Sequence, residues 1–253
     1  MGIEAIGAVV LGLLLGSFLS VLIERWHTKD GIIAGRSRCP HCMHALAWYD
    51  LVPLFSWLVL RGRCRYCKAP IHWRYPLMEL VMAGVLGGYV ARWGIPSGWE
   101  AVDIVVLFGL VALFFFDMRW MLLPDVFTYS LIGLLLVRLI AHTPSAFVGS
   151  VATAVFLAAL FMLLYLLTRG RGVGLGDVKF ALVIGLLFPY PAAFIVTVAA
   201  IWAGAIVGVA LMLLKLATRR TPMPFGSFWA AAALIAMLWP EPVAIISSWL
   251  SVQ

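Results

Sequence analysis

Charged residues are what this sequence has least of. Only 11% of its 253 residues are Asp, Glu, Lys or Arg, against about 25% in an ordinary soluble domain, while 64% are hydrophobic. A soluble domain of this length could not cover so much apolar surface, so the composition excludes one. Lipid is the solvent that such a chain requires.

Several other features are missing. The sequence has no repeat of fixed period, no low-complexity tract, and no G-x-G-x-x-G motif that would locate a nucleotide-type cofactor. It also lacks a cleavable secretory signal, because the first apolar run has no basic leader, carries Glu4, and is followed by charged residues instead of a small-residue cleavage site. We therefore expect that run to be retained as the first membrane span.

Long apolar stretches dominate what remains and predict an all-α polytopic membrane protein. We expect a first transmembrane helix within 1–23, a hydrophilic segment over 24–75, and a transmembrane bundle over 76–253. The sixth stretch is short and is followed by Pro189 and Pro191, so seven spans are the alternative to eight. The eight stretches are 3–23, 76–91, 101–116, 126–141, 147–167, 178–188, 192–216 and 228–250.

The basic residues are unevenly distributed between the stretches. Sixteen of the 18 Lys and Arg fall in the segments 24–75, 117–125, 168–179 and 215–227, and the exceptions are Arg92 and Arg138. Because basic loops stay in the cytoplasm, this bias predicts a bacterial inner-membrane protein with a periplasmic N-terminus. The same distribution argues against a nucleic-acid-binding surface, despite the net charge of +7.

All four cysteines lie in the hydrophilic segment, as two C-x2-C pairs separated by 21 residues. This spacing is typical of a structural zinc site, since each turn presents two sulfurs to one ion. Redox-active disulfides and idle thiols are the alternatives, and a reducing cytoplasm disfavours stable disulfides. A closed four-thiolate site leaves no position for an activated water, so we expect the metal to organise the segment. The predicted ligands are Cys39, Cys42, Cys64 and Cys67.

Seven of the 11 acidic residues lie at span ends, in loops or at the outer edge of a span, and the four that remain are Glu79, Asp117, Asp125 and Asp177. Asp117 ends the third stretch and Asp177 precedes the sixth, so both are expected at one membrane depth on the cytoplasmic side. Two carboxylates brought together there would supply a base that activates water and an acid that protonates a leaving amine. Gly174 and Gly176 would permit tight turns beside Asp177.

Other interpretations of these aspartates remain open. Asp177 has the position of a helix N-cap, and Asp125, which follows Pro124, is expected to be one. Asp117 has Arg119 nearby as an ion-pair partner. Two carboxylates in a membrane also suit a proton-coupled transporter, and a zinc-stabilised scaffold that binds a secretion ATPase or assembly platform is a third class.

The motifs resemble those of the type IV prepilin peptidases over essentially the whole chain. The resemblance covers Gly16-Ser17-Phe18-Leu19 with Arg25, the two cysteine pairs with Trp48-Tyr49-Asp50 between them, and Arg74-Tyr75-Pro76 with Glu79. Asp117 stands seven residues before Pro124-Asp125, as in the first active-site motif of that family, and Gly174-x-Gly176-Asp177 resembles the second. Two departures are Ser20 and Ser130, where the family often has Asn and Pro.

The resemblance implies a bifunctional enzyme with Asp117 and Asp177 as the catalytic pair. Its expected substrates are prepilins or pseudopilins, whose short basic leader precedes a hydrophobic helix held in membrane lipid. Cleavage at the cytoplasmic face would be followed by methylation of the new N-terminal residue with S-adenosylmethionine. The methyl-donor site is not located by any motif.

Overall fold

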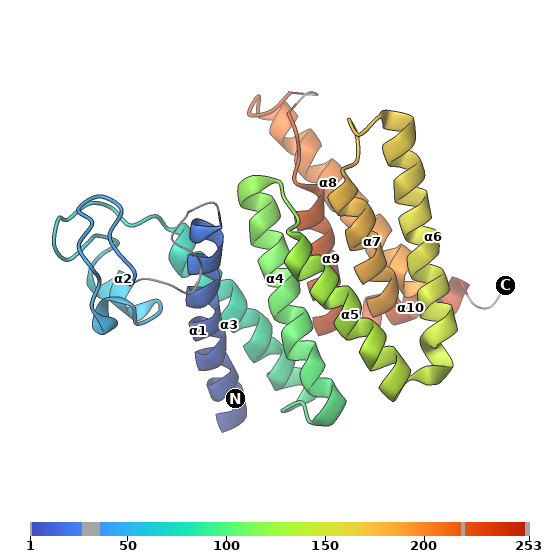
Figure 1. Ribbon diagram of the computed structural model, residues 1–253, viewed down its shortest axis with the longest axis horizontal. Helices are drawn as coiled ribbons and strands as arrows, with labels where there is room; N and C mark the ends of the chain where they lie inside the picture. Colours follow the sequence, from blue (N-terminus) through green and yellow to red (C-terminus); the bar gives the residue numbers. More distant parts are fainter. Residues whose placement is uncertain (1, 27–35, 219–220, 251–253) are drawn as a thin grey trace. The chain divides into compact units, whose positions relative to one another are not determined.

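The computed structural model describes residues 2–26, 36–218 and 221–250. Regular structure in those residues is helical, with two isolated β-bridges and no strand, which confirms the all-α prediction. The chain divides into two compact units, Met1–Ile95 and Pro96–Gln253. Figure 1 shows their helices in sequence colours.

The first unit joins two long helices to the cysteine-containing segment. Its helices are α1 (Ile3–Arg25), α2 (Phe55–Val59) and α3 (Arg74–Trp93), with a 3₁₀ turn at Trp48–Asp50. A Cβ added at Gly12 would lie 2.5 Å from the Cα of Ala83, and one at Gly16 would lie 2.5 Å from the Cα of Glu79. Glycines four residues apart thus let the backbones of α1 and α3 cross in direct contact.

The second unit contains seven helices in its described residues. Within it, α7 packs against both α5 and α6, and α9 packs against both α4 and α8. A 3₁₀ turn at Gly98–Ala101 leads into the first helix. The helices are α4 (Val102–Trp120), α5 (Asp125–His142), α6 (Pro144–Thr168), α7 (Leu175–Leu187), α8 (Ala192–Leu213), α9 (Phe225–Leu238) and α10 (Glu241–Leu250).

Small residues hold α6 against α7. A Cβ added at Gly185 would lie 2.3 Å from the Cα of Ala154, so the two backbones touch there. Ser150 and Thr153 are buried on the same stretch of α6, and the Thr153 hydroxyl donates to the Gly149 carbonyl at 2.8 Å. Because that polar group is satisfied within its own helix, the contact with α7 needs only close packing.

The described residues contain fewer candidate membrane spans than predicted. Among them, five helices are long and apolar enough to cross a bilayer: α1, Gly98–Trp120, α5, α6 and α8. The last predicted stretch is broken into α9 and α10, which bend by 92° and make a sixth span if counted together. The count of eight is therefore not confirmed.

The short length of α7 and the charged residues of α3 explain why these two helices are not among the candidate spans. α7 has 13 residues and extends about 20 Å, less than the ~30 Å hydrocarbon layer. α3 carries Arg74, Glu79 and Arg92 within its 20 residues. Large apolar side chains such as Val148 and Trp202 are exposed on α6 and α8, as expected for surfaces that face lipid. These apolar helices make the chain a multi-pass membrane protein.

One of the two exceptional arginines connects two helices. Arg138 near the end of α5 forms an ion pair with Asp103 in the first turn of α4. Asp103 is almost buried, and charges in a span persist when they are paired. Arg138 therefore joins α4 to α5, which is a structural role separate from the orientation of the protein in the membrane.

Candidate active site and metal centre

Asp117 lies in the last turn of α4 and is 5% exposed. Its Oδ2 accepts a hydrogen bond from the backbone N–H of Ser227 at 2.6 Å, and the Ser227 hydroxyl lies 2.9 Å from the same oxygen. In the described part of the chain, Asp117 has no ion pair. Arg119, proposed above as a partner, lies instead over the ring of Trp120.

Asp177 lies in the first turn of α7, three residues after the N-cap Gly174. Its Oδ2 accepts the N–H of Gly174 at 2.9 Å, so it satisfies one of the free donors at the helix start. The helix-capping interpretation is correct to that extent, although Asp177 is not the N-cap itself. This bond leaves the second carboxylate oxygen available for chemistry.

The reason given above for the two glycines needs correction. Gly174 has φ −88° and ψ 160°, an ordinary extended conformation, and Gly176 lies within α7, so neither makes a tight turn. A Cβ at Gly174 would lie 3.6 Å from the Asp177 Oδ2, which is an ordinary contact distance. The backbone angles and the space at this position therefore both admit a side chain.

Leu123 marks the place where the elements around the aspartates meet. A Cβ at Gly176 in α7 would lie 3.4 Å from Leu123, and one at Gly226 in α9 would lie 3.0 Å from Leu123 and 3.1 Å from the Asp117 Oδ2. Asp117 is also close enough to Asp177 for the two carboxylates to interact electrostatically. The end of α4 and the starts of α7 and α9 thus bring the two predicted aspartates together.

Ser227 is a site residue that the sequence reasoning missed. It stands 110 positions after Asp117, at the start of the last apolar stretch, directly after Gly226. The available signal was a small polar residue that follows Pro224 and a glycine at the beginning of a span. Its backbone and side chain hold one oxygen of Asp117 in place.

For the leader cleavage that the resemblance implies, we expect Ser227→Ala to slow the reaction by roughly five-fold. The substitution removes the hydroxyl, which contacts Asp117 and the Phe114 carbonyl and contributes about 1 kcal/mol, but keeps the backbone N–H that also binds Asp117. The measurement is kcat for cleavage of a prepilin by the purified variant. Ser248→Ala on exposed α10 is the matched control, and equal rates for the two variants would contradict this role for Ser227.

Asp125 is not an N-cap, so that prediction is wrong. α5 begins at Asp125 itself, and Pro124 fills the N-cap position with extended backbone angles. The Asp125 carboxylate instead forms an ion pair with Lys179 of α7, whose ammonium lies 5.5 Å from the centre of the Tyr129 ring. Asp125 therefore ties α5 to α7 beside the site.

The four cysteine sulfurs lie within 4.8 Å of one another, and Cys39 and Cys67 are 3.8 Å apart. All four are free thiols. Four sulfurs at about 2.3 Å from a tetrahedral zinc ion would be separated by about 3.8 Å. The donor set and its spacing therefore fit a metal ion.

Two turns of the same design present these sulfurs. In the first turn, the N–H of Met43 donates to the Cys39 carbonyl at 2.8 Å; in the second, the N–H of Lys68 donates to the Cys64 carbonyl at 3.0 Å. Met43 and Lys68 have positive φ angles of 56° and 61°. Each of these residues follows the second cysteine of its pair, so both turns close in the same way.

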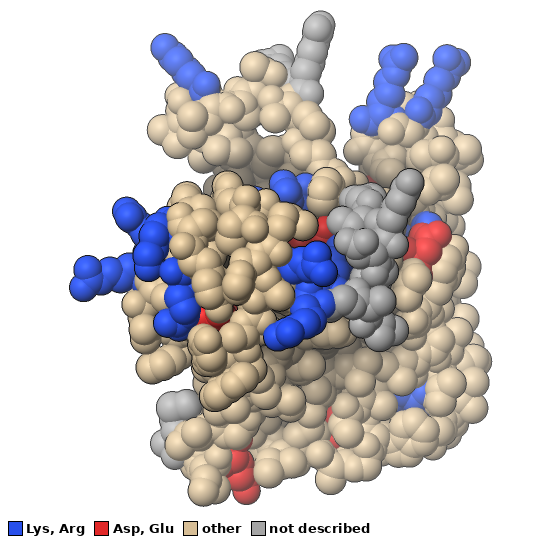
Figure 2. Space-filling model, turned by 60° about the vertical axis from the view of Figure 1, so that its left-hand side comes forward, with Lys and Arg blue, Asp and Glu red and all other residues tan. Residues whose placement is uncertain are grey.

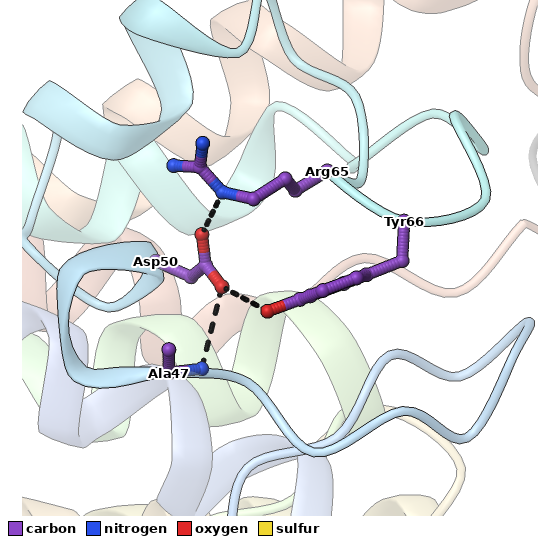
Figure 3. Close-up of polar contacts among 4 residues, drawn as sticks. All are labelled: Ala47, Asp50, Arg65 and Tyr66. Carbon is purple, nitrogen blue, oxygen red and sulfur yellow. Dashed lines mark hydrogen bonds and ion pairs between the residues drawn. The ribbon is translucent and has the colours of Figure 1, made fainter.

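A buried carboxylate joins the stretch between the two turns to the second turn. Asp50, whose side chain is 3% exposed, accepts hydrogen bonds from the N–H of Ala47, from Arg65 Nε at 2.7 Å and from the Tyr66 hydroxyl (Figure 3). The hydrogen bond with Asp50 raises the pKa of Arg65. Arg38, Arg61, Arg63 and Lys68 in this segment are exposed, and Figure 2 shows Lys and Arg side chains gathered on this side of the protein.

Two of the four thiols have shifted pKa values, in opposite directions. Burial raises the pKa of Cys39, but hydrogen bonds from the N–H groups of Cys42 and His41 outweigh burial and bring that pKa to about 6. The N–H of Ala69 lowers the pKa of Cys67, but desolvation and the neighbouring sulfurs raise it to about 11.

The chain has a helical membrane bundle that brings two aspartates together, and a segment with four clustered thiols. These are the features of a membrane-embedded aspartic peptidase. The Bacterial Peptidase A24 N-terminal domain matches residues 10–93, and the Type IV leader peptidase family matches residues 104–209. The chain belongs to this leader peptidase family.

Curated relatives cover nearly the whole chain. It is 37% identical to the prepilin leader peptidase/N-methyltransferase of Aeromonas hydrophila, over 92% of this chain and 90% of that protein. It is 34% identical to proteins of the same name from Stutzerimonas stutzeri, over 93% and 91%, and from Pseudomonas aeruginosa, over 93% and 90%. No solved structure matches the chain significantly.

Proposed function

We propose that this protein removes the leader peptide from type IV prepilins or pseudopilins and then methylates the new N-terminus. The observation that carries the proposal is the meeting of Asp117 and Asp177 at the ends of α4 and α7, in a chain whose relatives bear the name prepilin leader peptidase/N-methyltransferase. The substrate would be a membrane-embedded helix with a basic leader, presented in lipid.

In the proposed mechanism, the two carboxylates share one proton. The ionised carboxylate takes a proton from water, whose oxygen attacks the scissile carbonyl carbon, and the protonated carboxylate donates to the leaving nitrogen. Ser227 holds Asp117 and the N–H of Gly174 holds Asp177, so each keeps its place relative to the other.

We also propose that Cys39, Cys42, Cys64 and Cys67 bind a structural zinc ion. The sulfur spacing and the two matching turns support a closed tetrahedral site. Bound zinc would stabilise a segment that has few buried apolar side chains among its described residues. S-adenosylmethionine would supply the methyl group for the second reaction.

Incubation with a prepilin tests the proposed function directly. We expect the purified protein to release a fragment with the mass of the leader, and the remaining pilin to gain one methyl group when S-adenosylmethionine is present. Mass spectrometry of the pilin separates the two steps. A pilin of unchanged mass after incubation with folded protein would refute both activities.

The proposed orientation in the inner membrane has its own test. Reporter fusions at Arg61 and Arg171 should indicate the cytoplasm, and fusions at Ser97 and Thr143 should indicate the periplasm, because the basic residues gather on the first side. A periplasmic signal at Arg171 would put Asp177 on the wrong side for a cytoplasmic leader.

A further inference from the structure

The first unit contains a cavity of about 430 Å³, a volume typical of small-molecule sites. Residues of α1, α3 and the cysteine segment line it, so the cavity is formed by the first unit alone. Its lining combines charged and aromatic side chains, including Arg38, Trp57, Tyr75 and Glu79. Neither of the catalytic aspartates proposed above belongs to it.

Glu79 is the buried acid of this cavity. It is 7% exposed, and its Oε2 accepts the backbone N–H of Leu54 at 2.7 Å, with the Ser17 hydroxyl as a second hydrogen-bond partner. Within the described residues both partners are neutral. A buried carboxylate without a cationic partner is costly, so a cationic ligand in the cavity would supply the missing charge.

The backbone is strained where it meets Glu79. Leu54 has φ 59° and ψ −48°, and the N–H of Phe55 donates to the Pro53 carbonyl across it, which makes a γ-turn of the rare, strained kind. This conformation aims the N–H of Leu54 at Glu79. Strain held by the surrounding structure is a frequent mark of functional sites.

Asp50, the other well-buried acid of the cavity lining, is a contrast. Its carboxylate already accepts three hydrogen bonds, one of them from the cationic Arg65 (Figure 3). It is therefore neutralised by the segment it organises. Glu79 is the acid whose charge is still to be balanced.

We propose that this cavity is the methyl-transfer site and that Glu79 is its catalytic base, which binds the α-ammonium group of the cleaved pilin. This proposal rests on the proposed function. The ammonium group gives one proton to the Glu79 carboxylate, and the neutral amine attacks the methyl carbon of the sulfonium donor. The N–C bond forms as the C–S bond breaks, its electron pair stays on sulfur, and the products are a secondary ammonium group and a thioether.

The lining also suits the donor. Trp57 provides an aromatic face for a purine ring and Arg38 a cation for a carboxylate. A positioned general base that takes a proton from the reacting group contributes about 10²–10⁴-fold to the rate. Loss of Glu79 should therefore affect methyl transfer far more than the binding of the donor.

The test uses the full-length protein and a pilin peptide that already has a free N-terminal amine, so that methyl transfer is measured without proteolysis. We expect Glu79→Gln to lower methyl transfer at least about 10²-fold and Glu79→Asp to retain part of it. Wild-type protein should bind the free-amine peptide more tightly than its N-acetylated form, and Glu79→Gln should lose that preference. Glu4→Gln, at an exposed position in the same unit, is the matched control.

Intact prepilin and S-adenosylhomocysteine complete the experiment. Glu79→Gln should still release the leader and still bind S-adenosylhomocysteine. Three results would overturn the assignment. The first is undiminished methyl transfer by Glu79→Gln, and the second is a variant whose only defect is weaker binding of S-adenosylhomocysteine. The third is an equal fall of leader release and methyl transfer in both Glu79→Gln and Glu79→Asp. If wild-type protein itself neither cleaves nor methylates, the proposed function fails instead.

Discussion

Replacing either Asp117 or Asp177 by Asn should lower prepilin cleavage by at least about 10²-fold, because acid and base are both needed for hydrolysis of a peptide bond. The fold should survive, since the Asn side-chain oxygen still accepts the N–H of Ser227 at 117 or of Gly174 at 177. The measurement is the rate of leader release by purified, correctly inserted variants.

Asp125→Asn is the matched control for this pair. Asp125 lies beside the site, but its ion pair with Lys179 is exposed and worth at most about 1 kcal/mol. The control should therefore retain most of the activity. Full cleavage by Asp117→Asn or Asp177→Asn would eliminate the aspartic mechanism, and methyl transfer onto an already cleaved pilin should persist in both.

The second large effect is expected from the cysteines. Replacing Cys39 and Cys64 together by Ser takes one sulfur from each turn, so the protein should lose its metal and the segment around Asp50 should unfold. The measurement is zinc content by elemental analysis, alongside protease sensitivity of the segment. His41→Gln, which changes a side chain within the first turn but no sulfur, should keep the metal.

The two activities should respond differently to that loss. Both replaced cysteines line the cavity of the first unit, whereas the aspartates belong to the second unit. We therefore expect methyl transfer to fall more than leader release. A variant that is free of metal and still methylates at the wild-type rate would contradict a supporting role for zinc.

The sequence was most informative where the chemistry is local. The spacing within each cysteine pair predicted the four-sulfur cluster, since two residues between thiols confine both to one turn. Asp117 and Asp177 were singled out by their depth at the ends of apolar runs, and the structure brings them into electrostatic range.

The sequence was least informative where partners are distant. Ser227 meets Asp117 across 110 positions, and Lys179 meets Asp125 across 54, so no local pattern reveals either contact. The N-cap prediction for Asp125 failed for the same reason. A carboxylate at a helix start has several possible partners, and the partner of Asp125 is Lys179 of α7. The count of eight spans is not confirmed, and hydropathy alone does not show where a helix breaks, as it does between α9 and α10.

The shortness of α7 and α9 has a consequence for the surrounding bilayer. Both helices begin at the aspartate site and contain 13 and 14 residues, so each extends only about 20 Å through a layer about 30 Å thick. Both helices are mostly buried within the second unit, so this thin part of the bundle lies inside it, and headgroups and water can descend there toward Asp117 and Asp177. Such a local depression of the membrane surface would let a substrate helix reach hydrolytic water while most of its length stays in the acyl chains.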